Sequence, residues 1–309
     1  MAVRYRNLVY DSARWDGFAF RADDIVISTP PKAGTTLTQM MCALLVLQDP
    51  DLIGSIDELS PWLDMSTRSR DAVFARLEGQ RHRRFIKTHT PLDGLPYDER
   101  VTYVCVARDP RDMALSWDNH LFNIDFATFL AVRAGAVGVA DLAELAPGPP
   151  PEPPAELADR FWAYMDSPED PASPSPNLAS TVHHLATFFA VRDRPNVVLL
   201  HYADLTRDPA GQLRRLADRL GIAVGEDRWP ALVEATRFDR MRERADRLAP
   251  ESSNAIWRDN TRFFNRGTSG QWRTLLDAAG ERRYAARVAE LADPELLAWI
   301  HADASSVMY

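Results

Sequence analysis

The turn Pro-Pro-Lys-Ala-Gly-Thr-Thr follows an apolar stretch near the start of the chain and carries several groups that can bind an anion. Lys32 supplies a positive charge, and the hydroxyls of Thr35 and Thr36 supply hydrogen-bond donors. Apolar residues at helical spacing begin at Leu37, which predicts that the turn opens a helix. The amides from Ala33 to Thr36 would then be unpaired and would point, with the positive end of the helix dipole, at the bound anion.

The order of residues in this turn differs from that of the nucleotide triphosphate loop. That loop places its lysine after the second glycine and follows it with a Ser or Thr that holds Mg²⁺. In this chain Lys32 precedes Gly34. We therefore interpret the turn as P-loop-like without a metal ion. An ATP-dependent P-loop kinase on the same strand–turn–helix scaffold is the alternative.

The segment Phe-Ile-Lys-Thr-His-Thr-Pro at residues 85–91 is a second candidate. A β-strand alternates its side chains between two faces, so Lys87 and His89 share one face at the carboxyl end of this strand. In an open α/β sheet, ligands bind at that end. Because a neutral imidazole can take a proton from a hydroxyl near pH 7, we predict that His89 is a general base. The remaining histidines are interpreted as structural: His82, His120, His183, His184, His201 and His301.

A third candidate is Arg108 together with Ser116. Arg108 follows an apolar strand, and Asp109 and Pro110 mark the start of the next helix, which places Ser116 two turns into that helix. Taken singly, the two residues are typical of a surface arginine and a polar helix face. Their spacing gains its meaning from the resemblance described below.

The elements that position these residues alternate between strand and helix. Predicted strands are residues 25–28, 84–90, 101–107 and 196–202, and predicted helices follow residue 35 and cover 178–189 and 209–220. We predict one α/β domain over residues 1–309, with a central, mostly parallel sheet flanked by helices. The proline-rich stretch 147–177 is predicted to be a loop inside this domain, either a lid over the site or a surface excursion.

Composition adds limits to the function. The chain has 309 residues and a net charge of −8, so its overall field repels nucleic acid and membrane surfaces, and an anion site must be local. Cys42 and Cys105 lie in apolar runs, which favours reduced thiols in a reducing compartment. No apolar stretch approaches the ~20 residues that cross a bilayer, and the first residues lack the apolar core of a signal peptide. We therefore predict a cytoplasmic protein with no membrane span and no nucleic-acid partner.

Four blocks of the sequence together resemble the cytosolic-type sulfotransferases, which use 3′-phosphoadenosine 5′-phosphosulfate (PAPS). The blocks are residues 18–45, 84–121, 197–209 and 236–273, and their order and spacing match the family pattern. The resemblance implies transfer of a sulfuryl group from PAPS to a hydroxyl or amine of a small acceptor, with adenosine 3′,5′-bisphosphate as the other product and no metal. The aromatic residues of segments 1–22 and 117–130 favour an acceptor with an apolar body, so a phenol, a sterol-like alcohol or a lipid hydroxyl would suit better than a carbohydrate.

The resemblance also assigns roles to individual residues. It implies that His89 is the catalytic base and that Lys32 and Lys87 lie beside the transferred group. The residues that it assigns to the phosphosulfate are Lys32, Ala33, Gly34, Thr35 and Thr36, and it places Leu37 at the position next to the adenine. The residues that it assigns to the 3′-phosphate and the adenosine are Arg108, Ser116, Tyr202, Thr236, Phe238, Asn265, Arg266 and Gly267. It assigns Phe18 to the acceptor pocket.

Three features depart from the family pattern. Leu37 stands where the family usually has a tryptophan that stacks on adenine, and the lost stacking costs on the order of 1 kcal/mol. Asn265 replaces the first basic residue of the 3′-phosphate clamp. Both changes favour weaker PAPS binding and leave a catalytically weak nucleotide-binding relative as an alternative. Ala278 and its neighbour Asp277 replace the Thr-Val of the family's dimer motif, so the oligomeric state stays open.

Overall fold

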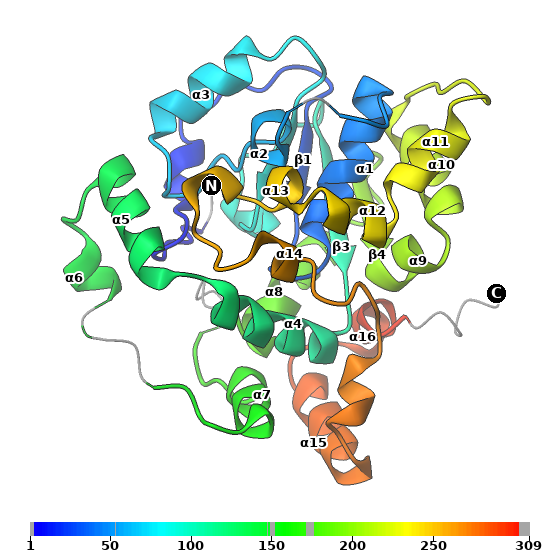
Figure 1. The fold of residues 1–309 in the computed structure, drawn as a ribbon. Coiled ribbons are helices and arrows are strands. Elements are labelled where there is room, and N and C mark those ends of the chain that lie inside the picture. Colours follow the sequence, from blue (N-terminus) through cyan, green and yellow to red (C-terminus); the bar gives the residue numbers. More distant parts are fainter. Residues whose placement is uncertain (1–2, 53, 147, 149–151, 171–175, 303–309) are drawn as a thin grey trace.

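Four parallel strands form the centre of the structure, a computed structural model that describes residues 3–52, 54–146, 148, 152–170 and 176–302 (Figure 1). The strands are β1 (Ile25–Ser28), β2 (Phe85–Thr88), β3 (Thr102–Ala107) and β4 (Val197–His201). Their order in the sheet is β2-β1-β3-β4, and every neighbouring pair is parallel. The predicted parallel sheet is therefore confirmed. The chain connects β1 to β2 at one edge of the sheet and β3 to β4 at the other. The carboxyl ends of β1 and β3 therefore flank a topological switch point, where such folds bind ligands.

The strands are apolar along their length because helices cover both faces of the sheet. Ile25 and Ile27 belong to one core cluster, and Val26, between them, belongs to the other. The first cluster includes residues from α1 (Thr35–Leu47), α10 (Pro209–Leu220) and α11 (Trp229–Ala235). The second includes residues from α3 (Arg70–Gly79), α8 (Leu178–Phe189), α15 (Ala278–Ala289) and α16 (Pro294–Ile300). Parallel strands buried on both faces are expected to read as continuous apolar runs, as these do.

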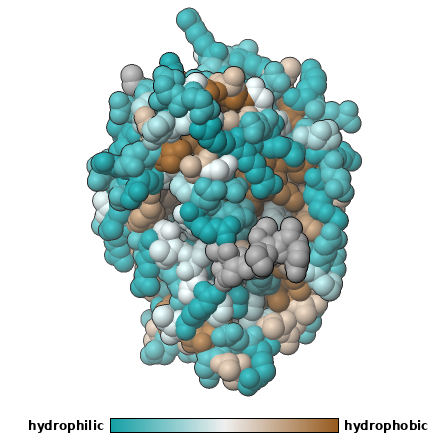
Figure 2. Space-filling view, turned by 90° about the vertical axis from the view of Figure 1, so that its right-hand side faces the viewer, coloured by the Kyte–Doolittle hydropathy of each residue, from teal (hydrophilic) through white to brown (hydrophobic). Residues whose placement is uncertain are grey.

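Further helices and turns lie around these layers. The remaining α-helices are α2 (Ile56–Leu59), α4 (Pro110–Asn123), α5 (Phe126–Val137), α6 (Leu142–Leu145), α7 (Leu157–Met165), α9 (Tyr202–Arg207), α12 (Phe238–Glu243), α13 (Ala245–Leu248) and α14 (Asn260–Phe263). Within the part of the chain that the structure describes, four 3-10 turns complete the list: η1 (Ser12–Trp15), η2 (Leu92–Gly94), η3 (Ser252–Asn254) and η4 (Gln271–Thr274). The face on the right of Figure 1 is covered mainly by hydrophilic side chains, with hydrophobic ones in small groups (Figure 2).

The prediction of a loop throughout residues 147–177 is wrong for residues 157–165. These residues form α7, which buries Phe161, Tyr164 and Met165 at helical spacing. The hydroxyl of Tyr164 also shares a hydrogen bond of 2.8 Å with that of Thr181 in α8. The prolines on either side dominated the composition and concealed this short amphipathic segment. Residues 147, 149–151 and 171–175 of the predicted lid lie outside the described residues.

Among the described residues, no helix has the length and apolar character required to span a bilayer.

Candidate active site

The turn between β1 and α1 builds a cradle of backbone amides. Lys32 and Gly34 have left-handed backbone conformations, with φ of 70° and 113°. The first hydrogen bond within α1 runs from the amide of Thr38 to the carbonyl of Gly34 at 3.0 Å. The amides of Thr35 and Thr36 therefore have no partner inside the helix and are available to an anion at its N-terminus.

Ala33 does not take the role that the sequence predicts. Its amide donates to the carbonyl of Pro30 at 3.3 Å, which closes the turn, and its side chain is buried. It is also absent from the lining of the cavity described below. The amide cradle therefore begins one residue later than predicted.

Glycine is required at position 34 for two reasons. The left-handed φ is costly for other residues. A Cβ at Gly34 would also lie 2.7 Å from Cδ2 of Tyr202, which opens α9 after β4. The turn and the aromatic ring therefore pack together directly, although they are far apart in the sequence.

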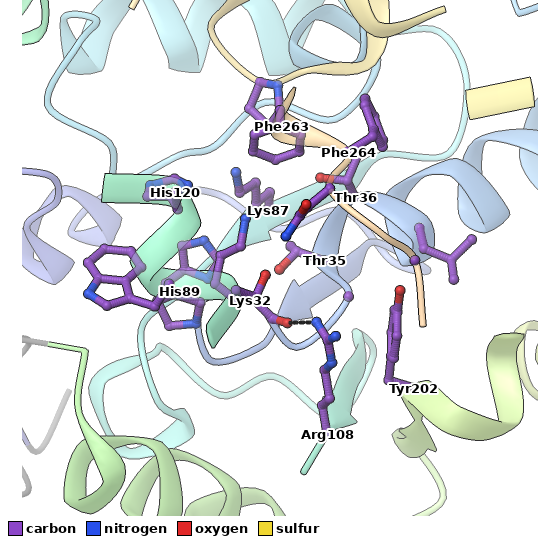
Figure 3. Close-up of a pocket in the computed structure, with 18 of the residues that line it drawn as sticks. Lys32, Thr35, Thr36, Lys87, His89, Arg108, His120, Tyr202, Phe263 and Phe264 are labelled. Atoms are coloured by element: carbon purple, nitrogen blue, oxygen red, sulfur yellow. Dashed lines mark hydrogen bonds between the residues drawn. The ribbon is translucent and has the colours of Figure 1, made fainter. Parts of the chain in front are cut away.

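Arg108 fastens this turn from the carboxyl end of β3. One of its terminal nitrogens donates to the carbonyl of Lys32 at 2.9 Å, and the other donates to the carbonyl of Thr268 at 3.1 Å (Figure 3). The guanidinium also lies 4.3 Å from the centre of the Tyr202 ring. Its Nε is buried and has no hydrogen-bond partner among the described residues.

Two lysines bring positive charge to the same place. The ammonium of Lys32 lies 4.6 Å from the centre of the Phe263 ring, and that of Lys87 lies 4.1 Å from the centre of the Trp62 ring. Burial, followed by the nearby charges of Arg108 and Lys87, lowers the pKa of Lys32 to about 7. Crowded, desolvated cations of this kind gain stability when an anion enters between them.

Carboxylates near Lys87 oppose the effect of burial on its pKa. Burial lowers the pKa of Lys87 to about 8, and the carboxylates of Asp57 and Glu251 act in the opposite direction. Glu251 is buried, and its Oε1 lies 3.2 Å from a guanidinium nitrogen of Arg68. The charge of Lys87 is therefore partly compensated by these carboxylates, and one of them, Glu251, also lines the cavity.

His89 is held in one orientation at the end of β2. Its Nδ1 lies 2.7 Å from the carbonyl oxygen of Thr29, so Nδ1 carries the proton and donates it in a hydrogen bond. The other nitrogen, Nε2, then has a free lone pair. Burial, and next the ammonium of Lys87, hold the pKa of His89 well below its usual range. The imidazole is thus neutral at pH 7, in the tautomer that a general base needs.

These groups surround a cavity of about 800 Å³. The predicted site residues that line it are Lys32, Gly34, Thr35, Thr36, Leu37, Lys87, His89, Arg108, Ser116, Tyr202, Thr236, Phe238, Asn265, Arg266 and Gly267. Figure 3 shows Lys32, Lys87 and His89 around one space, with Arg108 and Tyr202 to one side of it. Residues from four separate sequence blocks therefore meet at one site, as the sequence predicts.

The segment 265–267 packs against the start of α12. Gly267 has φ of 67°, and a Cβ there would clash with the ring of Phe238. Asn265 and Arg266 are exposed at the rim of the cavity. Thr236 is buried, and its hydroxyl donates to the carbonyl of Val233 at 2.7 Å.

The structure contradicts the placement of Phe18 in the acceptor pocket. Its ring packs at right angles to those of Trp15 and Phe20, with centroid distances of 5.7 Å and 5.3 Å. The buried guanidinium of Arg84 lies 4.9 Å from its centre. Phe18 is not among the residues that line the cavity. Its aromatic partners hold it instead against the core cluster that contains Trp15 and Val26.

Sequence reasoning missed most of the wall next to His89. Its apolar members are Leu8, Val9, Met65, Ile124, Phe129 and Ile256, and its aromatic members are Tyr10, Trp62, Trp117, Trp257 and Phe263. His120, which we predicted to be a structural residue, also lines this wall. Its position four residues after Ser116, on the same face of α4, is the signal that could have identified it.

Comparison with known proteins identifies the family. The profile described as "Sulfotransferase domain" matches residues 22–293, which is most of the chain. The chain belongs to the sulfotransferase family. The family assignment makes the protein an enzyme that transfers a sulfuryl group, and it rules out the P-loop kinase alternative.

Named relatives agree with the family assignment. The "Glycolipid sulfotransferase" of Mycobacterium bovis (strain BCG / Pasteur 1173P2) is 42% identical over 307 residues, covering 97% of this chain and 94% of that protein. "Glycolipid sulfotransferase Rv1373" of Mycobacterium tuberculosis (strain ATCC 25618 / H37Rv) is 42% identical over 310 residues, with coverages of 97% and 94%. "Sulfotransferase 2A6" of Mus musculus is 23% identical, with coverages of 85% and 81%.

Solved structures share the fold. Retinol dehydratase, crystallised with retinol and PAP, superposes with a TM-score of 0.67 at 20% identity, covering 92% of this chain and 85% of that one. Mouse sulfotransferase SULT7A1, crystallised with PAP, gives a TM-score of 0.62 at 18% identity, with coverages of 93% and 91%. At these identities the likeness concerns the fold.

Proposed function

We propose that this sulfotransferase moves a sulfuryl group from PAPS to a hydroxyl of an amphiphilic acceptor, such as a glycolipid, with His89 as the general base. The observation that carries the proposal is the orientation of His89. Its Nδ1–H is tied to the carbonyl of Thr29 at 2.7 Å, and the ring lines the same cavity as Lys32 and Lys87.

The residues of the site suit a doubly phosphorylated nucleotide. Nε of Arg108 is a buried donor without a partner among the described residues, and a phosphate oxygen would satisfy it. The free amides of Thr35 and Thr36 suit the 5′-phosphosulfate. Arg108, Ser116 and Arg266 would hold the 3′-phosphate, and Tyr202, Thr236 and Phe238 would hold the adenosine.

When bound, PAPS supplies an activated sulfuryl group on a phosphate leaving group. The ammonium groups of Lys32 and Lys87 stabilise the negative charge that grows on the sulfuryl and bridging oxygens. Nε2 of His89 accepts the proton of the acceptor hydroxyl. Its low pKa keeps the lone pair available, and negative charge that enters the cavity raises the proton affinity of the ring.

The acceptor side of the cavity favours a ligand with a large apolar body. Its wall contains aliphatic residues and several aromatic rings, including Met65, Ile124 and Phe129. The relatives at 42% identity are named glycolipid sulfotransferases, and the retinol and androsterone complexes of a fold relative also contain apolar alcohols. Nearly all the length of these relatives is covered, which supports extending their acceptor class to this chain.

We also infer that the enzyme acts in the cytoplasm. Cys42 and Cys105 are free and buried, and unpaired thiols suit a reducing compartment.

Transfer of radioactive sulfur from PAPS tests the proposal. We expect the wild-type enzyme to label an alkyl glycoside or a glycolipid extract without added metal. We also expect adenosine 3′,5′-bisphosphate, and not ATP with Mg²⁺, to raise its melting temperature. Nucleotide stabilisation without transfer to any hydroxyl acceptor would favour the alternative of a catalytically weak relative.

A further inference from the structure

His120 lies in an aromatic sleeve formed by Trp117, Trp257 and Phe263, in the cavity wall next to His89. Its ring stacks on that of Trp117, with a centroid distance of 4.9 Å and an angle of 20°. The edge of Trp257 meets it at 4.9 Å, and Phe263 lies at 6.4 Å. All four residues line the cavity, so the sleeve is part of the binding surface.

The imidazole has an unmet hydrogen-bonding capacity in this sleeve. Nδ1 of His120 is buried and has no partner among the described residues. A buried polar atom without a partner costs free energy, and such atoms in native proteins call for an explanation. Phenylalanine would fill the same space among these rings without that cost. Packing alone therefore does not account for a histidine here.

The position of His120 relates it to the reacting groups. Figure 3 shows His120 facing the space that Lys87, Lys32 and His89 also surround. Burial, followed by the charges of Lys32, His89 and Lys87, holds the pKa of His120 well below its usual range. The ring is therefore neutral, with one N–H donor and one lone pair, and suits a group that both donates and accepts.

Other polar groups line the same cavity. They include Tyr10 and Glu251, and Glu251 has a left-handed backbone conformation with φ of 60°. Non-glycine residues in that region are uncommon and concentrate at functional sites. Aromatic faces with hydrogen-bonding groups between them suit a sugar ring, which has apolar C–H faces and a rim of hydroxyls.

We propose that His120 is a specificity-determining residue that hydrogen-bonds a second hydroxyl of the acceptor, so that the enzyme prefers a sugar-bearing amphiphile to a simple alcohol. This inference rests on the proposed function, because it concerns the acceptor of the same reaction. A site built to hydrogen-bond a hydroxyl rejects an analogue that lacks it, since the buried polar group is then left unpaired.

Binding of two matched probes tests this role. Octyl β-glucoside and 1-octanol share the alkyl chain and differ in the sugar, and their dissociation constants can be measured by calorimetry on the complex with adenosine 3′,5′-bisphosphate. We expect His120→Phe to shift the ratio of the two constants against the glucoside by about tenfold. We expect His120→Asn, which restores an amide donor and acceptor near the place of Nδ1, to recover part of that preference.

A matched control and a second variant make the result decisive. His82→Phe makes the same exchange outside the cavity and leaves the ratio unchanged. His120→Met removes the polar ring with a flexible apolar chain, in case the phenylalanine variant does not fold. A ratio within twofold of wild type in either folded variant, or no binding of the glucoside by the wild type, overturns the inference. Absence of sulfuryl transfer by a wild type that binds the glucoside contradicts the proposed function instead.

Discussion

The indole N–H of Trp62 donates a hydrogen bond of 2.6 Å to the buried carboxylate of Asp64. The same carboxylate accepts hydrogen bonds of 2.6 Å from the hydroxyls of Thr88 and Thr90. These two threonines flank His89, whose ring meets that of Trp62 edge to face at 4.6 Å. One carboxylate thus fixes both the backbone that carries the base and the aromatic ring that packs against it.

Replacement of Asp64 by asparagine should separate positioning from binding. The amide group of asparagine would present N–H to donors in Trp62, Thr88 and Thr90, leaving at least one buried donor unpaired. We expect a loss of about 2–3 kcal/mol in the free energy of unfolding, measured in urea. We also expect kcat to fall more than the affinity for adenosine 3′,5′-bisphosphate, because the cradle of α1 is not touched.

Asp98→Asn is the control for this change. Asp98 pairs with Arg100 on the surface, at 2.6 Å, and is not among the residues that line the cavity. Its replacement should leave both stability and kcat close to wild type. Wild-type kcat in a stable Asp64→Asn enzyme would show that the carboxylate does not position the base.

Replacement of His89 by alanine tests the assignment of the base. Removal of a general base lowers turnover by about 10²–10⁴-fold. The affinity for adenosine 3′,5′-bisphosphate should change by less than about threefold, since its expected ligands are elsewhere. Steady-state kinetics and calorimetry measure the two effects. His82→Ala serves as the control, and equal turnover in the two variants would refute the role of His89.

The strands and the anion turn could be predicted because their signals are local. An apolar run that ends at Pro30 and continues as a helical pattern after Gly34 specifies strand, turn and helix in one short stretch. The same holds for the unit around Arg108, where Pro110 marks the first position of α4. Sequence order then suffices to bring both turns to one edge, because parallel strands share their carboxyl ends.

The acceptor wall could not be predicted because it has no local pattern. Its members come from the N-terminal arm, from the segment that pairs beside β2, and from α4, α5 and the residues before α14. An isolated β-bridge pairs the backbone of Trp62 with that of Lys87, and it brings Trp62 to the site from a separate segment of the chain. The prediction for Phe18 is wrong for the same reason. An aromatic residue in an irregular segment can pack into the core or face a ligand, and its packing partners, which the sequence does not show, decide between the two.

The affinity for adenosine 3′,5′-bisphosphate should fall as the pH rises above 7. Lys32 has a pKa of about 7 and Lys87 one of about 8 without ligand, and a bound anion favours the charged form of each. Above those values binding must take up protons, which weakens affinity by up to about tenfold per pH unit for each lysine. The second ionisation of a phosphate lies near pH 6 and is nearly complete in this range.

Calorimetry between pH 7 and 9, in buffers with different ionisation enthalpies, measures both the affinity and the proton uptake. Lys32→Arg should remove one part of the pH dependence, because arginine stays charged throughout. An affinity that is constant across this range, with no proton uptake, would contradict the depressed pKa of Lys32.

Replacement of Leu37 by tryptophan should strengthen nucleotide binding. Leu37 lines the cavity in the first turn of α1, where a larger ring could stack on the adenine. A base–aromatic stack is worth about 1–3 kcal/mol, so the dissociation constant of adenosine 3′,5′-bisphosphate should fall by at least about fivefold. Leu37→Ala, which removes the contact, should have the opposite effect. A weaker complex with the tryptophan variant would mean that the adenine lies elsewhere.

The contact between Gly34 and Tyr202 predicts that Gly34→Ala strains the backbone of the turn and displaces the ring of Tyr202. The added Cβ would lie 2.7 Å from Cδ2 of Tyr202, at a residue with φ of 113°. The strain should cost about 1–3 kcal/mol in the free energy of unfolding and should displace the ring that stacks on Arg108. We expect weaker binding of adenosine 3′,5′-bisphosphate in the fraction that stays folded.

Gly79→Ala is the matched control, because this glycine ends α3 with no atom within 4 Å of an added Cβ and no positive φ. It should be as stable as wild type or more so, since alanine restricts the unfolded chain. Equal stability and nucleotide affinity in both alanine variants would show that the turn can relax away from Tyr202, and that the close approach of the two does not shape the phosphosulfate cradle.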